Sequence, residues 1–249
     1  MAFVKRMIST NIIRRAGVVT TVAAIGALVS FAAGGCGGAG ITVNGLQNKT
    51  GPQVARDAAG VIGNARSVHV KGVIFSPRYR YDVRIQGSDA DGTMTVPGGQ
   101  AEIMIIGSKT GLANPNPDIY LKAGPDVLKK LFGTSAPVQD LAGRWLKLPQ
   151  SSAAWLPGFG FHLSDFTAAL DTFFSPPGPA VRQATLGGRK VVVVSYRDGS
   201  KLYVANTGPA YPLRWDDNGP GAGRTDFTGY GADFHISAPG DAVNLTGRG

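Results

Sequence analysis

The sequence predicts a single α+β domain built around an antiparallel sheet, and three observations lead to this class. An apolar stripe with a helical period covers residues 51–66, and alternation with a period of two follows it. The alternation is clearest where Tyr79, Tyr81, Val83 and Ile85 are separated by polar residues, which is typical of a sheet with one face in water. The 36 glycines and 16 prolines indicate many turns between short strands.

The first 35 residues are typical of an export signal. Basic residues, the last of them Arg15, precede an apolar run that ends in Ala33-Gly34-Gly35-Cys36. Small side chains directly before the only cysteine resemble a bacterial lipobox, in which the thiol is acylated (diacylglycerol, palmitate) and becomes the new N-terminus. We therefore predict a lipoprotein signal peptide at 1–35 and lipidation of Cys36. The alternative is an uncleaved membrane helix that ends at Cys36.

Either anchor places the rest of the chain at the cell membrane, on its extracytoplasmic side. Removing the signal leaves 249 − 35 = 214 residues, enough for one domain with a substantial core. The signal contains four of the 25 basic residues, so the remaining net charge is 21 − 16 = +5. No basic run with interleaved aromatic residues occurs, which excludes nucleic-acid binding.

The expected elements follow in order. Residues 36–49 form a lipidated, flexible, glycine-rich tether, and Thr50 to Gln53 is a capping box that begins the first helix. A turn is expected at Asp89–Gly92. Strands are expected at 68–75, 79–86, 93–96, 101–106 and 119–122.

The middle of the chain predicts helices at 125–132 and 163–174, the second one capped by Ser164. A strand at 144–148 and an aromatic loop at 155–161 lie between them. The last third returns to strands, and residues 239–249 form a flexible tail. These strands are expected at 181–186, 190–196, 201–205, 212–215, 225–230 and 232–237.

Six ordered segments, spread over residues 50–238, carry a family resemblance. They are Ala65–Val70, Asp118–Lys122, Gly143–Pro149, Leu163–Phe174, Leu186–Val191 and Tyr211–Trp215. Behind a lipobox, this set resembles the mycobacterial LppX/LprAFG lipoproteins. The resemblance implies a strongly curved antiparallel sheet, a half-open barrel with helices packed on its concave face, similar to LolA/LolB-type carriers. It also implies an apolar cavity that takes an acylated lipid. The Pro- and Gly-rich stretch 111–117 is longer than this family leads us to expect.

Large apolar side chains gather in the middle of the chain and are the candidates for lining such a cavity. They also fit an ordinary helix-on-sheet core, and the two interpretations stay open. The candidates are Phe132, Trp145, Trp155, Leu156, Phe159, Phe161, Phe166, Leu170, Phe173 and Phe174.

No catalytic constellation is present in the sequence, so we predict that the chain is not an enzyme and uses no cofactor. His69, His162 and His235 lack metal-ligand spacing, and no G-x-S-x-G elbow occurs. The first hypothesis is a membrane-anchored carrier of an acylated lipid, glycolipid or lipoglycan, with an envelope lipid transporter as a partner. The second is an envelope scaffold or interaction lipoprotein with a filled core. An enzyme acting on lipid or cell-wall substrates is a third, weaker hypothesis.

Overall fold

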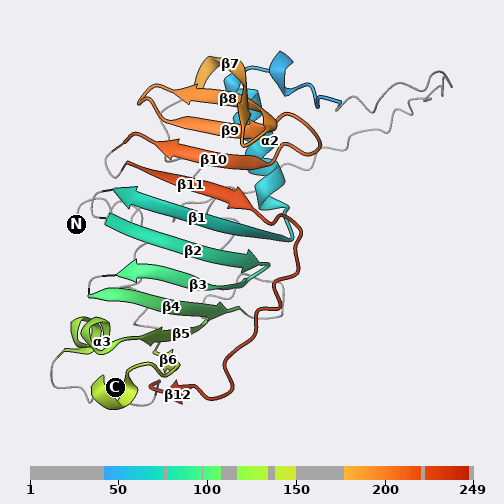
Figure 1. Ribbon diagram of the computed structural model, residues 1–249. Helices are drawn as coiled ribbons and strands as arrows, with labels where there is room; N and C mark the ends of the chain where they lie inside the picture. The colour runs from blue at the N-terminus through green and yellow to red at the C-terminus, as the bar shows by residue number, and fades with distance from the viewer. Residues whose placement is uncertain are drawn as a thin grey trace, which may run out of the picture.

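The computed structural model describes residues 42–75, 78–96, 98–107, 117–133, 138–149, 177–219 and 222–246. In this part of the chain a short 3-10 helix and three α-helices accompany one sheet (Figure 1). The helices are η1 (Leu46–Asn48), α2 (Gly51–Gly63), α3 (Pro125–Phe132) and α4 (Val138–Leu141). The strands are β1 (Ser67–Phe75), β2 (Arg78–Gln86), β3 (Asp89–Val96), β4 (Gly99–Ile106), β5 (Asp118–Ala123), β6 (Leu146–Leu148), β7 (Pro177–Leu186), β8 (Arg189–Tyr196), β9 (Lys201–Ala205), β10 (Pro212–Asp217), β11 (Gly223–Thr228) and β12 (Val243–Asn244).

The strands lie in the order β12-β6-β5-β4-β3-β2-β1-β11-β10-β9-β8-β7, so the described sheet has twelve strands and two free edges. Two antiparallel meanders, β1–β6 and β7–β11, meet where β1 pairs with β11. Among the described strands only β12 and β6 run parallel. The sheet does not close on itself, which confirms the predicted α+β class with a half-open barrel.

Alternation along β2 separates an apolar face from a polar face, as predicted, whereas β8 is buried on both faces from Val191 to Val194. We call the apolar face, which shares the hydrophobic core with α2, the inner face, and the other the outer face. On β2, the side chains of Tyr81, Val83 and Ile85 are 0–8% exposed, whereas Arg84 between them is exposed. Burying one such aliphatic side chain contributes about 1.5–3 kcal/mol.

The helix α2 packs across β7, β8, β9 and β10 on the inner face. Its apolar stripe, Val54, Ala58 and Ile62, is fully buried. The predicted capping box begins it, because the Gln53 amide oxygen accepts a hydrogen bond of 2.8 Å from the Thr50 backbone nitrogen. Near the other edge of the sheet, α3 contacts β4 and buries Val127 and Leu128. Both helices thus pack on the core side of the sheet.

Two local predictions were wrong. The β2–β3 turn lies at Gly87-Ser88 instead of Asp89–Gly92, because Gly87 supplies the positive φ (+59°) that a tight turn needs. Residues 232–237 form no strand. This stretch follows the ends of the strands toward β12 (Figure 1), and a side chain holds it where the Phe234 nitrogen donates to Gln86 Oε1 at 2.7 Å.

The domain extends further at both ends than predicted. Val43 and Leu46, which the sequence assigned to the tether, belong to the fold: Val43 forms a bridge with Thr207, and Leu46 is 2% exposed in the core. At the other end, Val243 and Leu245 donate backbone hydrogen bonds to β6 and its preceding residue, within the predicted tail. The predicted helix 163–174 and loop 155–161 lie outside the described residues.

Candidate functional site

The inner face presents an apolar wall across β11 and β1–β6. One row of side chains runs across these strands. Its members are register partners either directly or through one intervening strand, and they are Phe227, Val70, Val83, Ile103 and Leu121. Each of these side chains is at most 4% exposed. With strands about 4.8 Å apart, a wall over seven strands is roughly 25–30 Å wide. A parallel row, one pleat away, consists of Val68, Ile85, Ala90, Ile105, Ile119 and Leu148.

A polar pair, the buried Tyr81 and the half-buried Thr225, lies in this wall. The Tyr81 hydroxyl and Thr225 Oγ1 are 2.5 Å apart and share a hydrogen bond between β2 and β11. The Tyr81 ring lies over Gly72, where an added Cβ would be 2.3 Å from the phenol oxygen. Burial raises the pKa of Tyr81 to about 12, against the opposing effect of the Thr225 hydrogen bond. The phenol is therefore a neutral polar group on the inner face at physiological pH.

The structure describes two of the predicted cavity residues. Phe132 ends α3 and packs, partly buried, against the main core. Trp145 precedes β6, and Lys122 Nζ lies 5.8 Å from the centre of its ring. Lys122 is on the polar face, opposite Glu102, so Trp145 is beside an outer-face cation and does not line the apolar wall. The remaining predicted residues lie outside the described ranges: Cys36, Trp155, Leu156, Phe159, Phe161, Phe166, Leu170, Phe173 and Phe174.

The residues of the wall itself were missed as site candidates. Sequence alternation places Val83 and Ile85 on the apolar side of a strand, where aliphatic residues indicate only a core. Their membership of a wide, shared face depends on the pairing of β1 with β11, some 150 positions away in the chain. Period-two patterns identify the face of each strand but do not identify its neighbours.

The outer face carries a cross-strand row of opposite charges. Arg214, Asp226, Lys71 and Asp82 follow one another across β10, β11, β1 and β2. The Arg214 Nε to Asp226 Oδ1 distance is 2.6 Å, and the Lys71 Nζ to Asp82 Oδ2 distance is 2.8 Å. Exposed pairs of this kind contribute about 0–1 kcal/mol each. Along this row the outer face is a solvated surface and is poorly suited to an apolar ligand, whereas over β8 and β9 it buries a second hydrophobic cluster with Val191, Val193 and Ala205.

A hydroxyl, an imidazole and a carboxylate also align on the outer face. His69 Nε2 lies 2.5 Å from Asp82 Oδ1, and Thr228 Oγ1 lies 3.4 Å from His69 Nδ1. The second distance exceeds the roughly 2.6–3.2 Å of an activated nucleophile. Burial alone would raise the pKa of Asp82, but hydrogen bonds from Lys71 and His69 hold it below the usual value. The three groups occupy neighbouring register positions, as expected of a polar sheet face.

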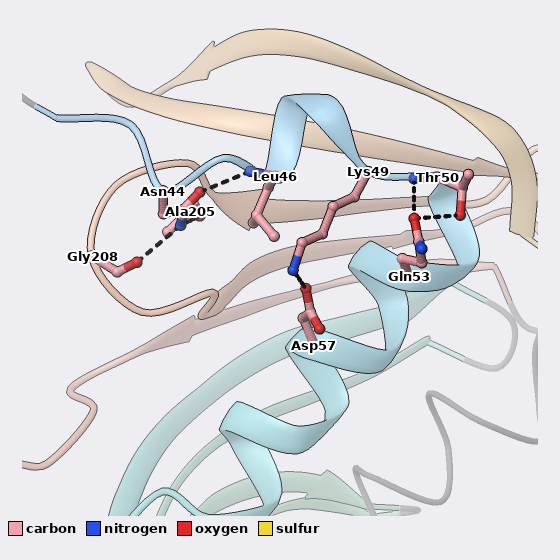
Figure 2. Close-up of polar contacts among 8 residues, drawn as sticks. All are labelled: Asn44, Leu46, Lys49, Thr50, Gln53, Asp57, Ala205 and Gly208. Carbon is pink, nitrogen blue, oxygen red and sulfur yellow. Dashed lines mark hydrogen bonds and ion pairs between the residues drawn. The ribbon is translucent and has the colours of Figure 1, made fainter. Parts of the chain in front are cut away.

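The first described residues are hydrogen-bonded to the end of β9 and to the loop between β9 and β10 (Figure 2). Asn44 Nδ2 donates to the carbonyl oxygens of Ala205 and Gly208, each at 2.9 Å, and Asn44 Oδ1 accepts from the Leu46 nitrogen at 3.3 Å. Lys49 Nζ lies 2.7 Å from Asp57 Oδ2 on α2. The chain therefore emerges toward its N-terminus next to the β9–β10 loop.

The described ranges hold neither a metal-binding cluster nor a membrane-spanning helix. Within them, no three His, Cys, Asp or Glu side chains form a group that could hold a metal ion. No helix in these ranges is long and apolar enough to cross a membrane.

Comparison with known proteins places the fold. No family model matches the chain, and no curated protein matches it. Among solved structures, LprF from Mycobacterium bovis is similar, with a TM-score of 0.51 and 14% identity over 76% of this chain and 96% of LprF. The lipoprotein LppX from Mycobacterium tuberculosis has a TM-score of 0.41 and 12% identity, over 75% of this chain and 99% of LppX. The resemblance predicted from the sequence is thus confirmed for the fold, which is similar to that of LprF.

Proposed function

We propose that this chain is a membrane-anchored lipoprotein that binds an acylated lipid or lipoglycan against the inner face of its sheet. In this proposal it carries or presents that lipid within the cell envelope, on the extracytoplasmic side of the cell membrane. The observation that supports it best is the apolar wall across β11 and β1–β6, in a sheet whose two edges stay apart. The proposed role is non-covalent binding, without catalysis and without a cofactor.

The energetics of such binding come from apolar burial. Each methylene moved from water to an apolar wall contributes about 0.8 kcal/mol. The acyl chains of one leaflet span about half of a hydrocarbon core of roughly 30 Å, which is less than the width of the wall. The charged outer face keeps the loaded protein in water. Binding needs no nucleotide at this protein, and an envelope lipid transporter acting upstream would supply the direction of flux.

A filled core is the second candidate, and the burial of the wall favours it. Side chains such as Val70, Ile85 and Leu148 are 0–2% exposed, so they are already covered. Close packing throughout would leave no room for an acyl chain. The chain would then act as an envelope scaffold or interaction lipoprotein.

Native mass spectrometry with lipid extraction separates the two candidates. The protein is residues 37–249, purified from an actinobacterial host without detergent. A carrier should show a stoichiometric mass of acylated lipid, whereas a scaffold should show the protein mass alone.

A substitution on the wall sharpens this test. Ala101 on β4 is 1% exposed and lies between Met94 and Ala123. In a carrier, Ala101→Leu should occupy ligand space and lower the lipid load with little change in stability. In a filled core, the same change should cost about 1–3 kcal/mol of unfolding free energy through overpacking. Thr93→Leu, on the outer face opposite Glu102, is the matched control. It should change neither the lipid load nor the free energy of unfolding.

A further inference from the structure

A groove of about 790 Å³ lies between α2, the first described residues and the loop from β9 to β10. We call it the α2 groove. Leu46, Val61, Ala65 and Ala210 contribute apolar lining. Tyr211 also lines it and stacks on Tyr230, with ring centroids 4.0 Å apart. The groove is thus separate from the apolar wall over β1–β6.

Positive charge dominates the lining. Among the described residues, the groove is lined by Lys49, Arg56 and Arg66 together with one carboxylate, Asp57. Lys49 is paired with Asp57, and Arg66 Nη2 lies 3.4 Å from Asp233, but these side chains are 36–65% exposed. Exposed pairs are weak and can exchange partners. Within the described residues, no ion pair is formed by Arg56.

The chain path brings this groove close to the proposed anchor. Asn44 lines the groove, and Val43 before it is bridged to Thr207. Only six residues, 37–42, lie between Cys36 and Val43. Fully extended, the seven Cα–Cα steps from Cys36 to Val43 span at most about 25 Å. An acylated Cys36 would therefore hold the groove within about that distance of the bilayer surface.

We infer that the α2 groove binds the phosphate head groups of anionic phospholipids in the membrane that holds the anchor. Guanidinium and ammonium groups match phosphate, and the apolar lining with Tyr211 suits the boundary between head group and acyl chain. The inference rests on the proposed function for the position of the anchor. It adds an orientation for the whole sheet, because the part of the molecule that carries the α2 groove then faces the bilayer.

Vesicle flotation tests the groove without the anchor. Residues 37–249 are mixed with vesicles of phosphatidylcholine alone, or of phosphatidylcholine with phosphatidylglycerol. Binding is expected only with phosphatidylglycerol, and added salt should weaken it. Arg56→Gln with Arg66→Gln should lower the partition coefficient about 25-fold, since one basic residue near an anionic surface is worth about fivefold.

The matched control neutralises two exposed arginines away from the groove. Arg182 lies on β7 and Arg197 in the β8–β9 turn. Arg182→Gln with Arg197→Gln gives the same net charge and should retain the wild-type partition coefficient. The inference would be overturned if both double variants lowered the partition coefficient equally. It would also be overturned if the wild-type protein bound equally to both vesicle types. Binding of inorganic phosphate to the protein without any vesicle binding would also overturn it, in favour of a soluble anion.

These outcomes are independent of the proposed function. The flotation protein lacks Cys36 and needs no lipid in its interior, so failure of lipidation or of lipid co-purification leaves the result intact. Thermal unfolding of each variant shows that a loss of binding is not a loss of fold.

Discussion

Gly72 is a position where one missing methyl group allows the inner face to form. A Cβ there would lie 2.3 Å from Tyr81 Oη and 2.7 Å from the backbone oxygen of Arg224. The backbone atom cannot turn aside as a flexible side chain can. The ring of Tyr81 therefore depends on this glycine to reach Thr225.

We predict that Gly72→Ala lowers the free energy of unfolding by about 1–3 kcal/mol, as overpacking generally does. Urea denaturation measures it. Gly60→Ala is the control, since Gly60 is an exposed helical position with nothing within 4 Å of an added Cβ. This second change should stabilise the protein by up to about 1 kcal/mol. If Gly72→Ala were as stable as wild type, the close packing of Tyr81 on β1 would be refuted.

Among the elements, the segment from Val43 to Lys49 differs most from the structure that its composition predicts. A glycine-rich stretch before a helix predicts a tether, yet Asn44 and Leu46 bind it to the β9–β10 region (Figure 2). No periodic pattern marks such a segment, because its partners are single carbonyl groups about 160 positions away.

We predict that Asn44→Ala frees this segment while the sheet stays folded. Two side-chain hydrogen bonds to backbone carbonyls are lost, at about 1 kcal/mol each. Amide hydrogen exchange at Asn48 and Lys49, whose nitrogens donate to Gly45 and Leu46, should accelerate about 30-fold for a loss of about 2 kcal/mol. Asn48→Ala, an exposed position in the same segment, should leave the exchange of Lys49 unchanged. Unchanged exchange in Asn44→Ala would show that the Asn44 side chain does not hold the segment.

Elements with a local signal were predictable, and elements with distant partners were not. The capping box at Thr50 and the apolar stripe of α2 located that helix, and alternation located β2 and its inner face. β12 has only two residues and depends on β6, so its own sequence carries too little pattern. Trp145 shows a further limit of prediction from sequence. Hydrophobicity marked it as a cavity residue, whereas the strand register places it beside Lys122 on the outer face.

At the scale of the whole molecule, the pairing of β1 with β11 joins the two meanders. This pairing brings the α2 region and the apolar wall into one hydrophobic core. The β9–β10 loop, where the N-terminal segment is fastened, then lies in the half of the sheet that ends at β7. A short connection to Cys36 would therefore hold the whole sheet in a restricted range of positions over the membrane.

Lipidation of Cys36 is the prediction on which this arrangement depends. In the producing bacterium, the wild-type chain should incorporate an alkyne analogue of palmitate, and its N-terminal peptide should begin at acylated Cys36. Cys36→Ser should incorporate no label and should retain residues 1–35, because the thiol that takes the diacylglycerol is absent. Gly38→Ser introduces the same hydroxyl beyond the cysteine, so it should be labelled and processed like wild type. A wild-type chain that keeps residues 1–35 without an acyl group would instead establish the uncleaved membrane helix as the anchor.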